Sequence, residues 1–191
     1  MKPRAGLFGE GRQFFDRFIE ECGVNCEIVT PQMVATPFYR GRFQALIIPT
    51  GFANPKYSNL LPAIRVSSSR IRRFVEGGGN LLVFGAGLDR PDAYDWLPFP
   101  ITYRHGYAEC SLTLTKDSAH TALVCDYDQS CIPCDGVFPS HDATVLATVA
   151  KDAVLLERAV GSGTILVTSI HEYPSRSFVT RFCTSGCETL F

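Results

Sequence analysis

Residues 80–87 have the sequence Asn80-Leu81-Leu82-Val83-Phe84-Gly85-Ala86-Gly87, which directly follows three glycines at positions 77–79. A short apolar run between such breakers is typical of a strand that is buried on both faces of a sheet. In open α/β sheets, ligands and catalytic groups gather where the carboxyl ends of such strands meet the next segment. A sharp turn of small residues after the strand is also where these folds present a nucleophile. This turn contains neither serine nor cysteine.

The chain before this stretch alternates between strand and helix patterns. Apolar runs predict strands at 5–8, 26–29 and 45–48, and helical spacing predicts helices at 14–22 and 67–76, with a short helix or loop at 32–43. Strands that alternate with helices indicate an α/β fold with a doubly wound, mainly parallel sheet that is covered by helices on both faces.

The second half of the chain has a different pattern. Residues 88–105 are rich in proline and aromatic side chains and predict a loop over the edge of the sheet. Strands are expected at 111–115, 122–125, 144–149, 153–157 and 164–170, and a closing helix at 175–187. The Gly161-Ser162-Gly163 turn predicts a hairpin, so the sheet should gain antiparallel strands toward the C-terminus.

Length and composition favour a single domain over residues 1–191. Apolar residues make up 46% of the chain, charged residues 19%, and the formal net charge is -1. This balance gives no support to binding of nucleic acid or of an anionic membrane surface. No apolar run is long enough to span a bilayer, and the N-terminal residues do not resemble a signal peptide, so we expect a cytoplasmic protein.

The eight cysteines are expected to be reduced in that compartment. Cys131 and Cys134 have the two-residue spacing of a zinc knuckle or a redox pair, and Cys125 lies just upstream. A second Cys-x-x-Cys pair is missing, so we expect no cofactor. Zinc bound by Cys125, Cys131 and Cys134, or redox chemistry at these thiols, is the alternative.

Four segments of the chain form a recognisable series, at residues 45–51, 74–87, 134–138 and 160–172. In that order they are similar to a strand that ends in Pro-Gly-Gly, a helix–glycine–strand–elbow unit, a Tyr-x-Gly-Gly-x-Phe stretch, and a closing hairpin that ends in His-x-Glu. Together they resemble the class I glutamine amidotransferase superfamily, in particular the subgroup that includes the N-terminal domain of some biotin-protein ligases. The resemblance implies a flavodoxin-like, amidotransferase-like fold over most of the chain.

The resemblance also implies where the site should lie. The elbow normally reads Gly-x-Cys-Ala-Gly, and a backbone amide after the Pro-Gly-Gly strand helps to form the oxyanion hole. The corresponding positions here are Thr50, Gly51, Gly85, Ala86 and Gly87. Alignment on Gly87 places Gly85 at the nucleophile position, and Ala86 is the alternative. Neither side chain can attack an amide carbon, so glutaminase activity is not expected.

His171 is the best candidate for a functional side chain, because it follows a predicted strand and is an acid–base group near neutral pH. Glu172 is the candidate for orienting it, although adjacent residues of a strand point to opposite faces. Cys134 is the candidate for a displaced nucleophile, provided that His171 lies within hydrogen-bond reach.

These observations favour an amidotransferase-like domain that has lost its nucleophile and binds a small molecule or a protein partner at the former active-site edge. A hydrolase or amidotransferase-type enzyme that uses His171 with Cys134 is the alternative. Exposed edge strands and the aromatic loop are also compatible with a homodimer.

Overall fold

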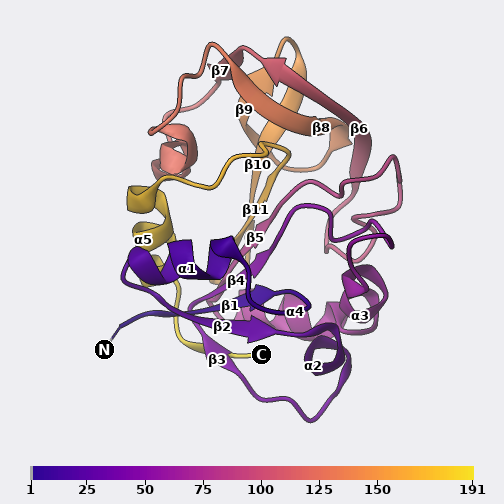
Figure 1. The fold of residues 1–191 in the computed structure, drawn as a ribbon, viewed down its shortest axis with the longest axis vertical. Coiled ribbons are helices and arrows are strands. Elements are labelled where there is room, and N and C mark those ends of the chain that lie inside the picture. Colours follow the sequence, from indigo (N-terminus) through magenta and orange to yellow (C-terminus); the bar gives the residue numbers. More distant parts are fainter. Residues whose placement is uncertain (1) are drawn as a thin grey trace.

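The computed structural model describes residues 2–191, which form one large mixed sheet with helices on both faces (Figure 1). Five strands are mutually parallel and follow the order β2-β1-β4-β5-β11. Counted among these five alone, this is the order 2-1-3-4-5 of flavodoxin-like sheets. Their bounds are β1 (Arg4–Phe8), β2 (Asn25–Val29), β4 (Ala45–Ile48), β5 (Asn80–Val83) and β11 (Gly163–Thr168). The flavodoxin-like, mainly parallel sheet expected from the sequence is confirmed.

Antiparallel strands extend the sheet beyond β11, as expected for the second half of the chain. β10 pairs with β11 and with β9, β8 pairs with β10 and with β6, and β7 pairs with β9. These strands are β6 (Ile101–Cys110), β7 (Leu112–Leu114), β8 (Ile132–His141), β9 (Thr144–Val149) and β10 (Asp152–Val160). A separate small sheet joins β3 (Arg42–Phe43) to β12 (Thr189–Leu190).

The helices cover the two faces of the sheet in two groups. α1 (Phe14–Glu21) and α5 (Arg176–Ser185) pack on one face, together with the 3₁₀ helix η1 (Ala119–Val124). α3 (Leu60–Val66) and α4 (Ser68–Glu76) pack on the other, and α2 (Pro31–Ala35) lies against α3. Leu81 and Val83 of β5 point into one core and Leu82 into the other, which is why this part of the strand is apolar.

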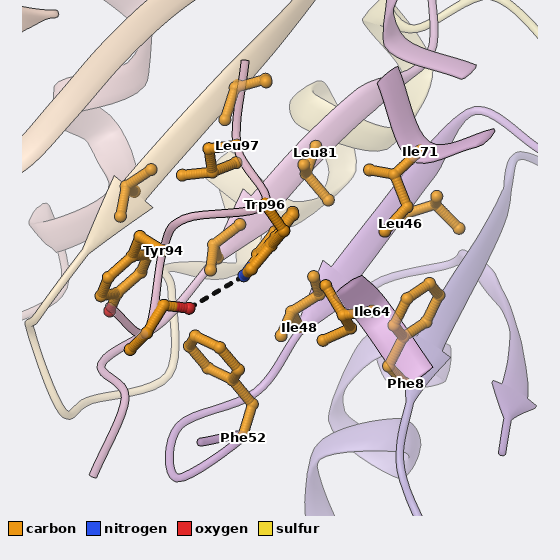
Figure 2. Close-up of a cluster of buried hydrophobic side chains, with 14 of the residues drawn as sticks. Phe8, Leu46, Ile48, Phe52, Ile64, Ile71, Leu81, Tyr94, Trp96 and Leu97 are labelled. Carbon is orange, nitrogen blue, oxygen red and sulfur yellow. Dashed lines mark hydrogen bonds between the residues drawn. The ribbon is translucent and has the colours of Figure 1, made fainter. Parts of the chain in front are cut away.

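The aromatic loop expected over the edge of the sheet is present, but only as far as residue 100, because β6 begins at Ile101. Tyr94, Trp96 and Leu97 are buried in the core on the α3 side. Figure 2 shows Trp96 above Phe52, with its indole nitrogen donating to the carbonyl of Ala93 at 2.9 Å. The Tyr94 hydroxyl donates to the carbonyl of Phe84 at 2.9 Å, which ties this loop to the end of β5.

Three local expectations are wrong. Residues 122–125 fall at the end of η1 and just beyond it and are not a strand, because Ser118 caps a helical turn by accepting the amide of His120. Helix α3 precedes the predicted helix at 67–76, in a segment for which the sequence pattern predicts no helix, since Pro62 hides its periodicity. The long strands β6 and β8 are missed because Gly106, Pro133 and Gly136 interrupt their alternation of apolar and polar residues.

Candidate functional site

His171 pairs with Asp135, a residue that the sequence patterns do not single out. The Nδ1 atom of His171 lies 2.8 Å from the Oδ1 atom of Asp135. Asp135 lies on β8, and His171 follows β11 after two intervening residues. Backbone hydrogen bonds hold the two segments together, from the Asp135 amide to the Ser169 carbonyl at 2.7 Å and from the His171 amide to the Pro133 carbonyl at 2.9 Å.

The Asp135 carboxylate is buried and has a second partner in Thr50, at the carboxyl end of β4. The Thr50 hydroxyl donates to the Oδ2 atom of Asp135 at 2.5 Å. The hydroxyl of Tyr103, on β6, donates to the backbone carbonyl of Asp135 at 2.8 Å. Burial raises the pKa of Tyr103 well above that of an exposed tyrosine, and the nearby Asp135 carboxylate adds to this, so the hydroxyl keeps its proton.

This arrangement leaves part of the histidine ring accessible. The side chain of His171 is 47% exposed, whereas that of Asp135 is 8% exposed. The ring of Tyr107 lies perpendicular to the His171 ring, with 5.7 Å between the ring centroids. If Nδ1 carries the proton that binds Asp135, Nε2 is the basic nitrogen and can accept a proton from a ligand.

The elbow residue Gly85 lies directly against Asp135. A Cβ atom at Gly85 would lie 2.9 Å from the Cβ of Asp135 and 3.1 Å from its Oδ2. It would also lie 3.4 Å from the Tyr103 hydroxyl. A larger side chain at this position therefore requires Asp135 to move. The space beside the elbow is filled by a carboxylate that comes from another strand.

The backbone around the expected oxyanion hole is closely packed. The Gly51 amide donates to the Gly85 carbonyl at 2.8 Å, so it is not free to bind an oxyanion. Gly51 and Gly87 have positive φ values of 78° and 68°, and a Cβ at Gly87 would lie 2.6 Å from the Gly51 Cα. The positive φ favours glycine at both positions, and at Gly87 the close approach of the Gly51 backbone leaves no room for a side chain. Ala86 is fully buried in the core on the α3 side.

Cys134 faces away from this edge. Its side chain belongs to the core on the α1 and α5 side, whereas the next residue of the strand, Asp135, points to the elbow. Burial raises the pKa of the Cys134 thiol to about 12, with the neighbouring Cys110 and Asp135 contributing further. The structure therefore argues against Cys134 as the displaced nucleophile, because a nucleophile must be an accessible thiolate.

The structure also argues against zinc bound by Cys125, Cys131 and Cys134. Cys125 is exposed, with its sulfur 3.6 Å from the Ser177 hydroxyl, and Cys131 is exposed beside Glu109. Cys134 is buried in the core. Across residues 2–191, no group of three or more His, Cys, Asp or Glu side chains is placed so that it could hold a metal ion. Closeness in sequence does not bring the three thiols together.

The carboxylate hydrogen-bonded to His171 belongs to Asp135, whereas the sequence makes Glu172 the candidate for orienting it. Burial raises the pKa of Tyr127, and the charge of Glu172 adds to this. Asp135 takes the orienting position instead. One feature of the sequence could have identified Asp135. It is a carboxylate directly before Gly136, within the segment 134–138 that resembles the ligase-like subgroup.

Comparisons with known proteins support the fold. Neither the protein-family models nor the curated protein sequences give a match. Among solved structures, a proposed GMP synthase subunit from Thermoplasma acidophilum aligns with a TM-score of 0.66 and 13% identity, over 97% of this chain and 96% of that one. The cytoplasmic protein STM1381 from Salmonella typhimurium aligns with a TM-score of 0.54 and 14% identity, over 95% of each chain.

The same fold also occurs within larger proteins. A β-galactosidase from Rahnella sp. R3 aligns with a TM-score of 0.58 and 12% identity, over 97% of this chain but only 30% of that one. At these identities the likeness shows a shared fold alone. Within residues 2–191, no helix is both long and apolar enough to cross a membrane.

Proposed function

We propose that this chain is an amidotransferase-like domain without glutaminase activity, which binds a small molecule at the edge formed by Thr50, Asp135 and His171. The observation that carries the proposal is the contact between Gly85 and Asp135. The elbow position has no side chain, and the Asp135 carboxylate lies where a nucleophile would extend from it.

Two further features argue against amide hydrolysis. The Gly51 amide donates a hydrogen bond to the Gly85 carbonyl, so it is not available to stabilise an oxyanion. The buried Cys134 thiol, with its pKa raised to about 12, supplies no thiolate. What remains at the edge is a set of polar groups held in fixed positions, which suits binding better than covalent catalysis.

The experiment has two parts. Ammonia release from L-glutamine is expected to stay at the level of a protein-free blank. A library of small polar fragments, titrated into ¹⁵N-labelled protein, is expected to yield ligands that shift the amide signals of Thr50, Asp135 and His171. Ammonia release that disappears in a His171→Ala variant would contradict the loss of glutaminase activity. Fragments that bind only at distant sites would contradict the binding role.

One observation favours a second candidate function. His171 is half exposed, and its Nδ1 atom is held by a buried carboxylate, as in a histidine that serves as a general base. Such a histidine could activate water in a hydrolase that has no side-chain nucleophile. Hydrolysis of p-nitrophenyl acetate would then fall at least tenfold in His171→Ala and stay unchanged in His120→Ala, whose imidazole pairs with Glu157 instead. Equal rates in both variants would exclude this candidate.

We further infer a cytoplasmic location and a homodimer. Two structural neighbours from Salmonella typhimurium are described as cytoplasmic proteins, and β2 and β6 are the end strands of the main sheet order. Light scattering on the eluate of a size-exclusion column, over a range of protein concentrations, tests the dimer. A constant mass near 21.0 kDa would contradict it.

A further inference from the structure

A small cavity adjoins the site at Thr50. Its volume is about 190 Å³, and it lies between the loop after β1, the end of β4 and the segment that leads into α3. The lining residues that matter here are Glu10, Thr50, Gly51, Tyr57 and Ser58. This volume lies below the roughly 300–1,000 Å³ of sites for drug-sized molecules, so the ligand must be small.

Glu10 gives the cavity its charge. Among the described residues that line the cavity it is the one charged side chain, and none of them is a lysine or arginine. Its Oε1 atom accepts the backbone amide of Asn59 at 3.0 Å and the side-chain amide of Asn59 at 3.3 Å. Its Oε2 atom has no hydrogen-bond partner within residues 2–191, so a carboxylate oxygen held in place remains for a ligand.

Thr50 can only accept a hydrogen bond from a ligand. Its hydroxyl carries one proton, and that proton is directed at the Asp135 carboxylate. The lone pairs of Thr50 Oγ1 are therefore what it offers to the cavity. The Asp135 carboxylate accepts from Thr50 on one side and from His171 on the other. A ligand that donates to Thr50 would lengthen this network, and each of its hydrogen bonds would still be directed toward the buried carboxylate.

Tyr57 supplies an aromatic wall. Its ring lies 3.8 Å from the position of a Cβ at Gly51, and the residue is 75% exposed. An exposed tyrosine ring beside a carboxylate is a favourable environment for a cation, because the ring face is electronegative. Ser58 accepts the Leu60 amide at 3.1 Å, so its own hydroxyl proton is free to donate.

We propose that this cavity binds a small primary amine in its ammonium form, with the ammonium group between Glu10, Thr50 and Tyr57. The proposal rests on the binding function proposed above and names its ligand class. The three N–H donors of an ammonium match one carboxylate oxygen, one hydroxyl lone pair and one ring face. A carboxylate ligand would face Glu10, with Asp135 behind Thr50, and would be repelled.

The test compares three probes of similar size by NMR titration of ¹⁵N-labelled protein at constant ionic strength. They are n-propylammonium chloride, propionamide and sodium propionate. We expect n-propylammonium to shift the amide signals of Gly51, Tyr57 and Ser58, and to bind at least tenfold more tightly than propionamide. Propionate is expected to leave these signals unchanged.

Variants identify the groups responsible. Glu10→Gln keeps an oxygen that can accept from Asn59 but removes the charge, and should weaken n-propylammonium binding at least tenfold. Tyr57→Leu should weaken it at least threefold through loss of the ring face. Glu172→Gln removes a carboxylate that lies outside the cavity and should change nothing. The dispersion of the amide signals shows directly whether each variant is folded.

Several outcomes would overturn this assignment. Propionamide or propionate binding as tightly as n-propylammonium would do so, as would unchanged affinity in Glu10→Gln or the absence of shifts with all three probes. The proposed loss of glutaminase activity is judged separately by ammonia release, and the general binding role by the fragment titration. Failure of the ammonium assignment is therefore distinguishable from failure of the proposed function.

Discussion

The Oδ1 atom of Asp135 lies 2.8 Å from the Nδ1 atom of His171, and this contact joins β8 to the segment that follows β11, beside the elbow. A proton on Nδ1 makes it a charge-assisted hydrogen bond, which is stronger than a neutral one. The contact also leaves Nε2 as the ring nitrogen of His171 that is not bonded to Asp135.

The tautomer of His171 is the first prediction. In the neutral ring, the proton should sit on Nδ1, because that nitrogen faces a carboxylate, and Nε2 should be unprotonated. Replacement Asp135→Ala should abolish this preference and shift the ring toward the Nε2-protonated form. Ring ¹⁵N chemical shifts of the neutral histidine, measured in alkaline buffer, report the populations. A proton on Nε2 in the unmodified protein would contradict the hydrogen-bond assignment.

A cysteine at the elbow is the second prediction. The change Gly85→Cys should not create glutaminase activity, and it should destabilise the fold by about 1–3 kcal/mol, because its Cβ would lie within 2.9 Å of Asp135. Urea unfolding measures the cost. Gly11→Cys is the matched control, since a Cβ there meets no atom within 4 Å. Equal stability of the two variants would show that Asp135 moves aside freely.

Cysteine reactivity is the third prediction. Iodoacetamide at pH 8 should modify the exposed Cys125 and Cys187 first, and leave Cys134 and Cys183 unmodified in the folded protein. Burial raises the pKa of both protected thiols to about 12, so their thiolate is scarce. Mass spectrometry of the peptides gives each rate. Early modification of Cys134, slowed by His171→Ala, would restore it as a candidate nucleophile.

The raised pKa values of Cys134 and Cys183 lead to the fourth prediction, which is that the free energy of unfolding falls at alkaline pH. Their pKa values are raised from 9.0 to about 12 on folding, so the unfolded chain releases their protons first as the pH rises. Their contribution to stability is complete below pH 9 and is lost between about pH 9 and 12, by at most about 1.4 kcal/mol per pH unit for each thiol.

Urea unfolding between pH 8 and pH 11.5 measures this loss. A Cys134→Ala, Cys183→Ala double variant serves as the comparison, because tyrosines also titrate in this range. The free energy of unfolding should fall less steeply with pH in the double variant. Parallel curves would mean that these thiols titrate alike in the folded and unfolded states.

Phe191 is the subject of the last prediction. Its ring is buried against Phe8 and lies under the Arg70 guanidinium, 4.2 Å from the ring centroid. Its backbone makes two hydrogen bonds with Gly41. Phe191→Ala should therefore cost about 3–5 kcal/mol of stability. Phe38→Ala, at a residue that is 86% exposed, should cost under about 0.5 kcal/mol. Similar melting temperatures for the two variants would contradict the packing.

Local sequence accounts for the parallel part of the sheet. The apolar runs at 45–48 and 81–83 and the glycines near them can be recognised within a few residues. A strand that is buried on both faces carries consecutive apolar side chains, so each run by itself predicts such a strand. The absence of a nucleophilic side chain at Gly85 could be read in the same way. His171 could be placed at a strand end because a long apolar run precedes it.

Only the tertiary structure decided what surrounds His171. Asp135 is 36 positions away in the chain, on a strand whose proline and glycine disguise its pattern. Its meeting with His171 and Thr50 depends on the pairing of β8 with its neighbours and on which face each side chain takes. A shift of one residue in β8 would bring Cys134 to the elbow and bury Asp135 in the core. Strand pairing over such distances is set by packing, and no short stretch of the sequence records it.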